Sequence, residues 1–496
     1  HNKAIEYRKK TGNLSDQAFS YDKVGSLYSK QGNPEKAMEY FTKAVELYQT
    51  AKNDVGMASV YDNIGAMYKK LKDFEKTFDY FKKSLAVKEK ANDKYAIAEN
   101  YFEQGLAYME FNDAANAQEA LKKSFELNML VNDKMDAIYC MINLGQIQYG
   151  FRNNFDTALT VFNSALSLAK EIANNSPIAY CYKQLGLLYS EKGESGTSIK
   201  YLDSALTIYE KMQEKSEIGN LYISLGSASI SGGDFDKAMS FYSKSETVAR
   251  EMNNNTLLGD VYLYKGDLYR VLGEYKKAMA IFDTAYSYYS TQNNPWALAS
   301  IYISYGNVYN VMGEYQKSVD NYSRADSIYT ALKNDYYRAT PLNNMGTVYF
   351  WQGDYHSSLP FFQKALAILD SVKYFGDFRA TVLTNIGEIN YELKNYDEAE
   401  KVLLTAIEHA RKIGAKTHLP TPYGLLASIY IDTKKYAESE KWAKMAYDLS
   451  SELKDRNDIL YSSLVLGRLN YINNNIPVSN KYLDQSITVA EELGTN

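Results

Sequence analysis

The chain is poor in several residues that mark common classes of protein. Its 496 residues include only 2 cysteines, 4 histidines and 8 prolines. Two cysteines cannot make a disulfide framework, so the cytoplasm and the periplasm both remain compatible with the sequence. No apolar run approaches the roughly 20 residues that cross a bilayer, so we expect no membrane insertion within this region. The few prolines fall mostly in predicted turns and leave long segments free to be helical.

Basic clusters and catalytic motifs are also missing. The net charge is −5, and no Lys/Arg cluster is suited to a phosphate backbone, which predicts no direct nucleic-acid binding. Phosphate-loop, dinucleotide and nucleophile-elbow motifs are absent, so we expect no catalytic residue and no enzyme activity. His356, His409 and His418 lack the spacing of metal ligands and are predicted to be solvated surface side chains. We therefore expect neither a metal nor another cofactor.

What the sequence does contain is repetition. Residues 21–48 read YDKVGSLYSKQGNPEKAMEYFTKAVELY, and residues 61–88 read YDNIGAMYKKLKDFEKTFDYFKKSLAVK. A glycine inside a helix costs about 1 kcal/mol relative to alanine, so a recurrent one indicates a packing requirement for a small residue. Ala427 stands at the one gap in the series. The glycines recur every 40 or 41 residues: Gly25, Gly65, Gly105, Gly145, Gly186, Gly226, Gly266, Gly306, Gly346, Gly387 and, past the gap, Gly467.

A second small residue follows each of these by 19 or 20 positions, with a large apolar or aromatic residue three places before it in most repeats. The apolar residues between them recur at three and four, which predicts two helices per repeat. The turns carry Gly or Asn, which favour a left-handed helix end, and Asp, Glu or Asn at the next helix start. The second small residues are Ala44, Ser84, Ser124, Ala165, Ala205, Ser245, Ala285, Ala325, Ala365, Ala406, Ala446 and Ser486.

This pattern of a small residue at a helix crossing, a tyrosine three places later and Ala or Ser in the second helix resembles the tetratricopeptide repeat family. The resemblance implies an all-α fold, a right-handed superhelical solenoid of about twelve helix-turn-helix repeats. The unit is about six residues longer than the usual 34, and the family's proline at the end of the second helix is missing. The longer form is similar to repeats of bacterial peptide-sensing regulators and cell-polarity adaptors.

The repeat pattern gives a domain assignment for the whole chain. Residues 1–14 align with the second helix of a preceding repeat, and residues 15–496 are predicted to be twelve tandem repeats in one solenoid. The sequence starts inside the second helix of one repeat and stops where another repeat would begin, so we expect it to be part of something longer. Cys140 and Cys181 each lie five residues before the glycine of their repeat, and packed helices hold such places too far apart for a disulfide. We predict two free, half-buried thiols.

The family resemblance also implies a concave surface, lined by the first-helix positions that the packing framework does not use. Early in the chain these are Asp62, Asn63, Lys69 and Lys70. Asparagine is frequent among the later ones, although it is a poor helix former, and an amide suits the main chain of an extended peptide. The predicted peptide-binding groove consists of Tyr264, Asp267, Arg270, Asn307, Asn310, Asn343, Asn344, Thr347, Phe350, Trp351, Asn385 and Glu388.

The predicted function is the binding of a protein or peptide segment in this groove. One alternative is the sensory or regulatory region of a larger signalling protein with a histidine kinase or DNA-binding domain. Another is a passive assembly scaffold that uses the convex face. The family's carboxylate clamp for chaperone tails is not reproduced, because Leu187 stands where the asparagine that accompanies Lys183 belongs. The oligomeric state stays open.

Overall fold

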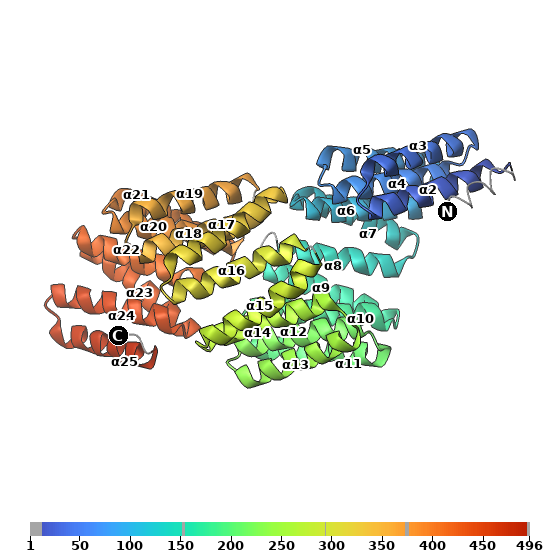
Figure 1. Ribbon diagram of the computed structural model, residues 1–496. Helices are drawn as coiled ribbons and strands as arrows, with labels where there is room; N and C mark the ends of the chain where they lie inside the picture. The colour runs from blue at the N-terminus through green and yellow to red at the C-terminus, as the bar shows by residue number, and fades with distance from the viewer. Residues whose placement is uncertain (1–11, 151–153, 293, 373–375, 494–496) are drawn as a thin grey trace. The chain divides into compact units, whose positions relative to one another are not determined.

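The computed structural model describes residues 12–150, 154–292, 294–372 and 376–493 of the chain. Within these ranges all regular structure is helical, which confirms the predicted all-α fold. The helices follow one another as consecutive pairs joined by short turns, and the two helices of each pair pack side by side (Figure 1). Most of the predicted remnant repeat at residues 1–14 lies outside the described residues.

The chain divides into two compact units, residues 1–149 with 155–212 and residues 213–496 with 150–154. The assignment of residues 15–496 to one continuous solenoid stays a prediction. The helices of the first unit are α2 (Leu14–Lys30), α3 (Pro34–Thr50), α4 (Asp54–Lys70), α5 (Phe74–Lys90), α6 (Lys94–Glu110), α7 (Ala114–Leu130), α8 (Lys134–Gly150), α9 (Phe155–Glu171), α10 (Asn175–Glu191) and α11 (Ser195–Met212).

The second unit carries the predicted groove. Its helices are α12 (Lys215–Ser231), α13 (Phe235–Glu251), α14 (Asn255–Val271), α15 (Tyr275–Thr291), α16 (Pro295–Val311), α17 (Tyr315–Ala331), α18 (Asp335–Trp351), α19 (Tyr355–Ser371), α20 (Asp377–Glu392), α21 (Tyr396–Lys412), the 3-10 helix η1 (Lys416–His418), α22 (Pro420–Asp432), α23 (Tyr436–Leu453), α24 (Arg456–Ile472) and α25 (Ile476–Leu493).

Each recurrent glycine lies against a large side chain of its own partner helix. A Cβ atom on Gly226 would lie 2.3 Å from the ring of Tyr242, and one on Gly306 would lie 2.4 Å from the ring of Tyr322. Real Cβ atoms do not make contacts this short, so any side chain at these places would force the two helices apart. Ala427, which replaces the glycine in α22, is fully buried. The predicted requirement for a small residue is therefore confirmed.

The turns use the predicted chemistry with one difference. Gly32, Gly273 and other turn glycines have φ near +73°, and Asn33 or Asp73 accepts a backbone N–H at the start of the next helix. Between repeats, however, the left-handed residue is not always asparagine. In the turn before α4 it is Lys52, and the asparagine that follows it caps the helix instead.

Of three packing predictions, one is confirmed and two need correction. The second small residues are all buried, as expected. The two cysteines are free, but both are completely buried rather than half-buried, and burial raises the pKa of Cys140 to about 11 and of Cys181 to about 12. The prediction that prolines fall mostly in turns is wrong, because most lie in the first turn of a helix, while Pro341 lies inside α18 and Pro360 inside α19.

Candidate functional site

The predicted groove residues come from four first helices of the second unit, α14, α16, α18 and α20. First helices of neighbouring pairs contact one another, as α12 does with α14, α14 with α16, and α20 with α22. These helices thus form one layer within the unit, and the unused face of each carries the polar side chains described next.

Four asparagines of this layer form a continuous chain of hydrogen bonds. Asn385 Nδ2 of α20 donates to Asn343 Oδ1 of α18 at 3.0 Å, and Asn343 Nδ2 donates to Asn344 Oδ1 at 3.4 Å. Asn344 Nδ2 then donates to Asn307 Oδ1 of α16 at 3.5 Å, where the Tyr322 hydroxyl also donates at 2.7 Å. The predicted alignment of amides across successive repeats therefore exists, and the amides are bonded to one another.

Not every predicted groove amide faces solvent. Asn343 is only 7% exposed, so it belongs to the packed layer and links Asn344 to Asn385. Asn310 is half-buried, and its Oδ1 atom is buried without a hydrogen-bond partner among the described residues. Thr347 donates its hydroxyl to the carbonyl of Asn343. An amide nitrogen carries two N–H groups, so the half-buried amides keep donor capacity beyond these bonds.

A cavity of about 500 Å³ adjoins one end of the amide chain. Tyr264, Asp267, Arg270 and Asn307 line it together with apolar side chains of α14 and α16. Arg270 Nε donates to Asp267 Oδ1 at 3.2 Å. Burial raises the pKa of Asp267, although Arg270 partly opposes that rise. The structure thus brings four predicted residues into one cavity, which has a largely apolar lining and an ion pair inside it.

The two aromatic residues predicted to contact the peptide, Phe350 and Trp351, differ in exposure. Phe350 is half-buried and packs against Tyr355, with ring centroids 5.5 Å apart. Trp351 is 65% exposed and touches Phe350 edge-on. Of these two residues, Trp351 therefore presents the large apolar surface to solvent.

Glu388 is the most perturbed carboxyl of the predicted set. Its side chain is half-buried on α20. Burial, followed by the nearby Glu392 carboxylate, raises the pKa of Glu388 to about 7. A carboxyl with a raised pKa is more easily protonated in the folded than in the unfolded protein.

Glu388→Gln should raise stability near pH 8 and leave it unchanged near pH 4. The pKa of glutamate in the unfolded chain is about 4.3, and that of Glu388 in the folded protein is about 7. Ionising Glu388 therefore costs the folded protein no stability below about pH 4.3, and the loss of stability grows as pH rises through about 7. We expect a gain of about 1–2 kcal/mol at the higher pH, reduced from the full shift because the group is partly solvated. Urea unfolding at both pH values measures it, and an equal gain at the two would contradict the raised pKa.

The early charged face, in the first unit, is paired internally. Asp62 accepts from Lys88 at 2.7 Å and from Asn100 at 3.0 Å. Asn63 donates to Asp22 at 2.8 Å, and Lys69 lies 3.5 Å from Glu103. The Asp62–Lys88 contact lies within one helix pair, and the other three contacts link neighbouring repeats.

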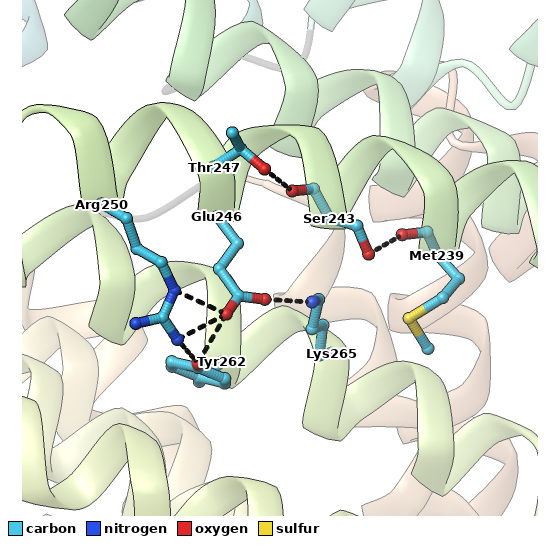
Figure 2. A network of polar contacts seen from close by, with 7 residues as sticks. All are labelled: Met239, Ser243, Glu246, Thr247, Arg250, Tyr262 and Lys265. Atoms are coloured by element: carbon cyan, nitrogen blue, oxygen red, sulfur yellow. Dashed lines mark hydrogen bonds and ion pairs between the residues drawn. The ribbon is translucent and has the colours of Figure 1, made fainter.

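A polar network between α13 and α14 was not predicted from the sequence. Figure 2 shows Glu246 at its centre, with Lys265, Arg250 and Tyr262 pointing toward the carboxylate. Lys265 Nζ donates to Glu246 Oε2 at 2.5 Å, while the Tyr262 hydroxyl and Arg250 Nη2 each donate to Oε1 at 2.7 Å. Burial opposes ionisation of Glu246, but these hydrogen bonds outweigh it and lower its pKa to about 2.

The histidine prediction is wrong for one residue. His409 is only 8% exposed, and its Nε2 lies 3.0 Å from the carbonyl oxygen of Gly376. Burial is the main cause that lowers the pKa of His409. His418 is half-buried beside Asp377, whereas His356 is exposed as predicted.

The described residues hold no group of three or more His, Cys, Asp or Glu side chains that could bind a metal ion. Their helices also include none that is both long and apolar enough to cross a membrane.

Comparison with known proteins identifies the class of the chain. Residues 297–371 and 378–448 match the tetratricopeptide repeat family. Residues 1–141 match the family of soluble NSF attachment proteins, and residues 142–301 match a family described as an uncharacterized protein conserved in bacteria. No curated protein matches the sequence significantly.

Several solved structures are similar to the chain at low sequence identity. A signal transduction ATPase with numerous domains from Pyrococcus horikoshii, which has a tetratricopeptide repeat sensor, is 13% identical, with 95% of this chain and 73% of that chain covered and a TM-score of 0.51. Yeast Tom70 is 14% identical, with 94% and 99% covered and a TM-score of 0.49. A Rap protein complexed with competence and sporulation factor is 17% identical, with 72% and 99% covered and a TM-score of 0.49.

Residues 297–371 and 378–448 are therefore tetratricopeptide repeats, and the helix pairs and sequence pattern of the other described residues support the same class of repeat protein. Proteins of this class are protein-interaction scaffolds that are typically not catalytic. The absence of enzyme activity and of nucleic-acid binding in this chain stay predictions.

Proposed function

We propose that the chain binds an extended segment of a protein partner along the first-helix face of its second unit. The observation that carries this proposal is the hydrogen-bonded chain of amides from Asn307 through Asn344 and Asn343 to Asn385. Such a row offers both donors and acceptors at intervals along one face, which suits the repeating N–H and C=O groups of an extended main chain.

The groups beside the amides would supply selectivity. The cavity at Asp267 and Arg270 accepts a side chain and presents one charge of each sign to it. The exposed indole of Trp351, the last residue of α18, offers an apolar contact. Contacts with the peptide main chain would then give affinity that depends little on the peptide sequence. The cavity and the Trp351 indole would select particular side chains of the peptide.

A sensory role within a larger signalling protein is the second candidate. The likeness in fold to the Pyrococcus protein, whose repeats are described as a sensor, favours it over a passive scaffold. Peptide binding and a sensory role are compatible, because a sensor of this kind would bind its signal on the same face. A scaffold that uses only the convex face would be unaffected by changes to the amides.

Alanine at both Asn344 and Asn385 should weaken peptide binding by about 30-fold or more, since each lost hydrogen bond to a desolvated main-chain group is worth about 1–3 kcal/mol and two are lost. These two are chosen because they are half-buried, whereas Asn343 is packed inside the layer. Peptides selected on the native chain from a random display library serve as ligands, and calorimetry measures the affinity.

Asn163→Ala is the matched control, because this asparagine is exposed on the second helix α9 and should leave affinity unchanged. Circular dichroism checks that the double variant keeps its helicity. Unchanged affinity with intact helicity would move binding away from the amide row, and a selection that yields no binding peptide would also contradict the proposal.

A further inference from the structure

Several helix pairs carry a cluster of three aromatic rings. Two are the framework tyrosines, four residues before and three residues after the small residue of the first helix. In the first pair, Tyr40 of α3 stacks on Tyr28 with centroids 5.4 Å apart and lies 6.0 Å from Tyr21. We call the place of Tyr40, four residues before the small residue of the second helix, the third-ring place. The same stacking occurs for Tyr80 on Tyr68 (5.8 Å), Tyr201 on Tyr189 (5.5 Å) and Phe361 on Tyr349 (5.4 Å).

The pair α16–α17 lacks the third ring. It keeps both framework tyrosines, Tyr302 and Tyr309, but Asn321 occupies the third-ring place. The Asn321 amide donates to the carbonyl of Lys317 at 2.7 Å, so it turns back along its own helix. A cavity of about 510 Å³ lies here, lined by Tyr302, Tyr309 and Asn321 among others. It shares no lining residue with the cavity at Asp267.

The cation that accompanies a third ring is retained at this cavity. In several ring-filled pairs, though not in α10–α11 where the residue is Ser204, the residue just before the small residue of the second helix places its ammonium over the third ring, as Lys83 does over Tyr80 at 4.5 Å. Lys43 and Lys364 do the same at 5.6 and 5.7 Å. The equivalent residue in α17 is Arg324, whose guanidinium lies 5.5 Å from the ring of Tyr302. A cation is attracted to the face of an aromatic ring. Arg324 therefore already supplies the cation that a ring bound at this place would contact.

Two other pairs show that a framework tyrosine accepts a ring from elsewhere. In α6–α7 the third-ring place is Ala120, and Phe78 of the preceding helix α5 stacks on Tyr108 at 3.9 Å. In α14–α15 the place is Ile281, and Tyr288 stacks on Tyr262 at 5.7 Å.

In α16–α17, by contrast, no ring among the described residues is stacked on a framework tyrosine. Tyr286 meets Tyr302 edge-on, at 6.1 Å and 64°. Lys317 lies 5.3 Å from the ring of Tyr309, as Lys36 does over Tyr28 in the first pair, where the third ring is also present. A lysine in this place therefore does not exclude a stacked ring.

We propose that the cavity on α16–α17 is a binding site for an aromatic side chain, phenyl or phenol, of a protein partner. The ring would take the third-ring place, stacked on Tyr309 and flanked by Arg324, as the rings of the other pairs are. Asp283 and Asp320 also line the cavity and are acceptors for the hydroxyl of an entering phenol. The site is separate from the amide row and does not depend on it.

N-acetyl-L-tyrosinamide and N-acetyl-L-phenylalaninamide are the probes, with N-acetyl-L-leucinamide as the aliphatic comparison. Titration followed by NMR should show saturable binding of both aromatic amides to the native chain and at least tenfold weaker binding of the leucine derivative. Asn321→Tyr supplies the missing ring from within, so it should abolish this binding and keep or raise the melting temperature. No saturable binding to the native chain, equal binding of the leucine derivative, or unchanged binding to Asn321→Tyr would overturn the proposal.

Removing a third ring from another helix pair tests whether the missing ring is what creates the binding site. Phe361→Asn removes the third ring from α18–α19 and leaves Tyr349 without its stacking partner. In the folded variant, checked by circular dichroism, the stoichiometry for N-acetyl-L-tyrosinamide should rise from one to two. An unchanged stoichiometry with retained helicity would show that the absent ring does not create the site. If the variant does not fold, the comparison of Asn321→Tyr with the native chain decides the matter.

Discussion

Leucine at Gly306 should lower the free energy of unfolding by about 3 kcal/mol or more. A Cβ atom at this place would lie 2.4 Å from Cε1 and 2.7 Å from Cδ1 of Tyr322. The ring cannot turn aside, because Tyr322 is buried and its hydroxyl donates to Asn307 at 2.7 Å. Alanine shares only the Cβ collision and should lose less, about 1–2 kcal/mol. Urea unfolding followed by circular dichroism measures both variants.

Gly196→Ala is the matched control for the glycine variants. Gly196 also lies in a helix, α11, but it is exposed and nothing lies within 4 Å of an added Cβ atom. Alanine there should leave stability unchanged or raise it by up to about 1 kcal/mol, because alanine is the better helix former. An unchanged melting temperature for Gly306→Leu would mean that the repeat register is wrong.

A double variant separates the helix crossing from helix propensity. Tyr322→Ala should lose less stability in a Gly306→Ala background than in the native chain, since removing the ring there also relieves its collision with the added Cβ atom. If the two losses simply add, the tyrosine ring is not what requires glycine at this crossing.

The sequence predicted this feature because the constraint is local and repeated. A first helix and its partner cross at one contact, and a large ring on one side leaves no room for a side chain on the other, as Gly266 shows against Phe282. The restriction recurs every 40 or 41 residues and is visible without coordinates. The same regularity made the helix pairs, the caps and the buried second small residues predictable.

The polar side chains were harder to predict because their surroundings come from neighbouring repeats. Asn343 and Asn344 are adjacent in the sequence, yet the 100° turn between successive helical residues buries the first and leaves the second half-exposed. Whether an amide pairs with solvent or with Asn385, 42 residues away, depends on side-chain torsions and on the stacking of the pairs. Position in the repeat therefore identified the face but not the exposure of each residue.

The network around Glu246 did leave a signal in the sequence. Lys265 stands directly before the recurrent glycine, a place that holds Leu185 in α10. Glu246 stands directly after the second small residue, a place that holds Leu166 in α9. Leu166 and Leu185 share one apolar cluster, so the two charges occupy places that are core elsewhere. Opposite charges at two such places predict a buried ion pair.

Glu246→Ala should lower the free energy of unfolding by about 3–5 kcal/mol. Lys265 is 9% exposed and would keep a buried ammonium without its carboxylate, while Tyr262 would lose its acceptor. Glu39→Ala is the control, because Glu39 also pairs with a lysine at 2.5 Å, but both side chains are exposed. Exposed pairs contribute about 0–1 kcal/mol, so burial and not distance should set the difference.

The pH dependence and a compensating variant test the same ion pair. Because the pKa of Glu246 is lowered to about 2 from about 4.3 in the unfolded chain, its stabilisation is complete above the higher value. It is lost as pH falls through about 2, so the difference between native protein and Glu246→Ala should shrink across this range. Glu246→Leu combined with Lys265→Leu copies the α9–α10 arrangement and should recover most of the loss, since a buried ion pair is often replaceable by apolar residues. A double variant as unstable as Glu246→Ala would show that the loss comes from packing and not from an unpaired charge.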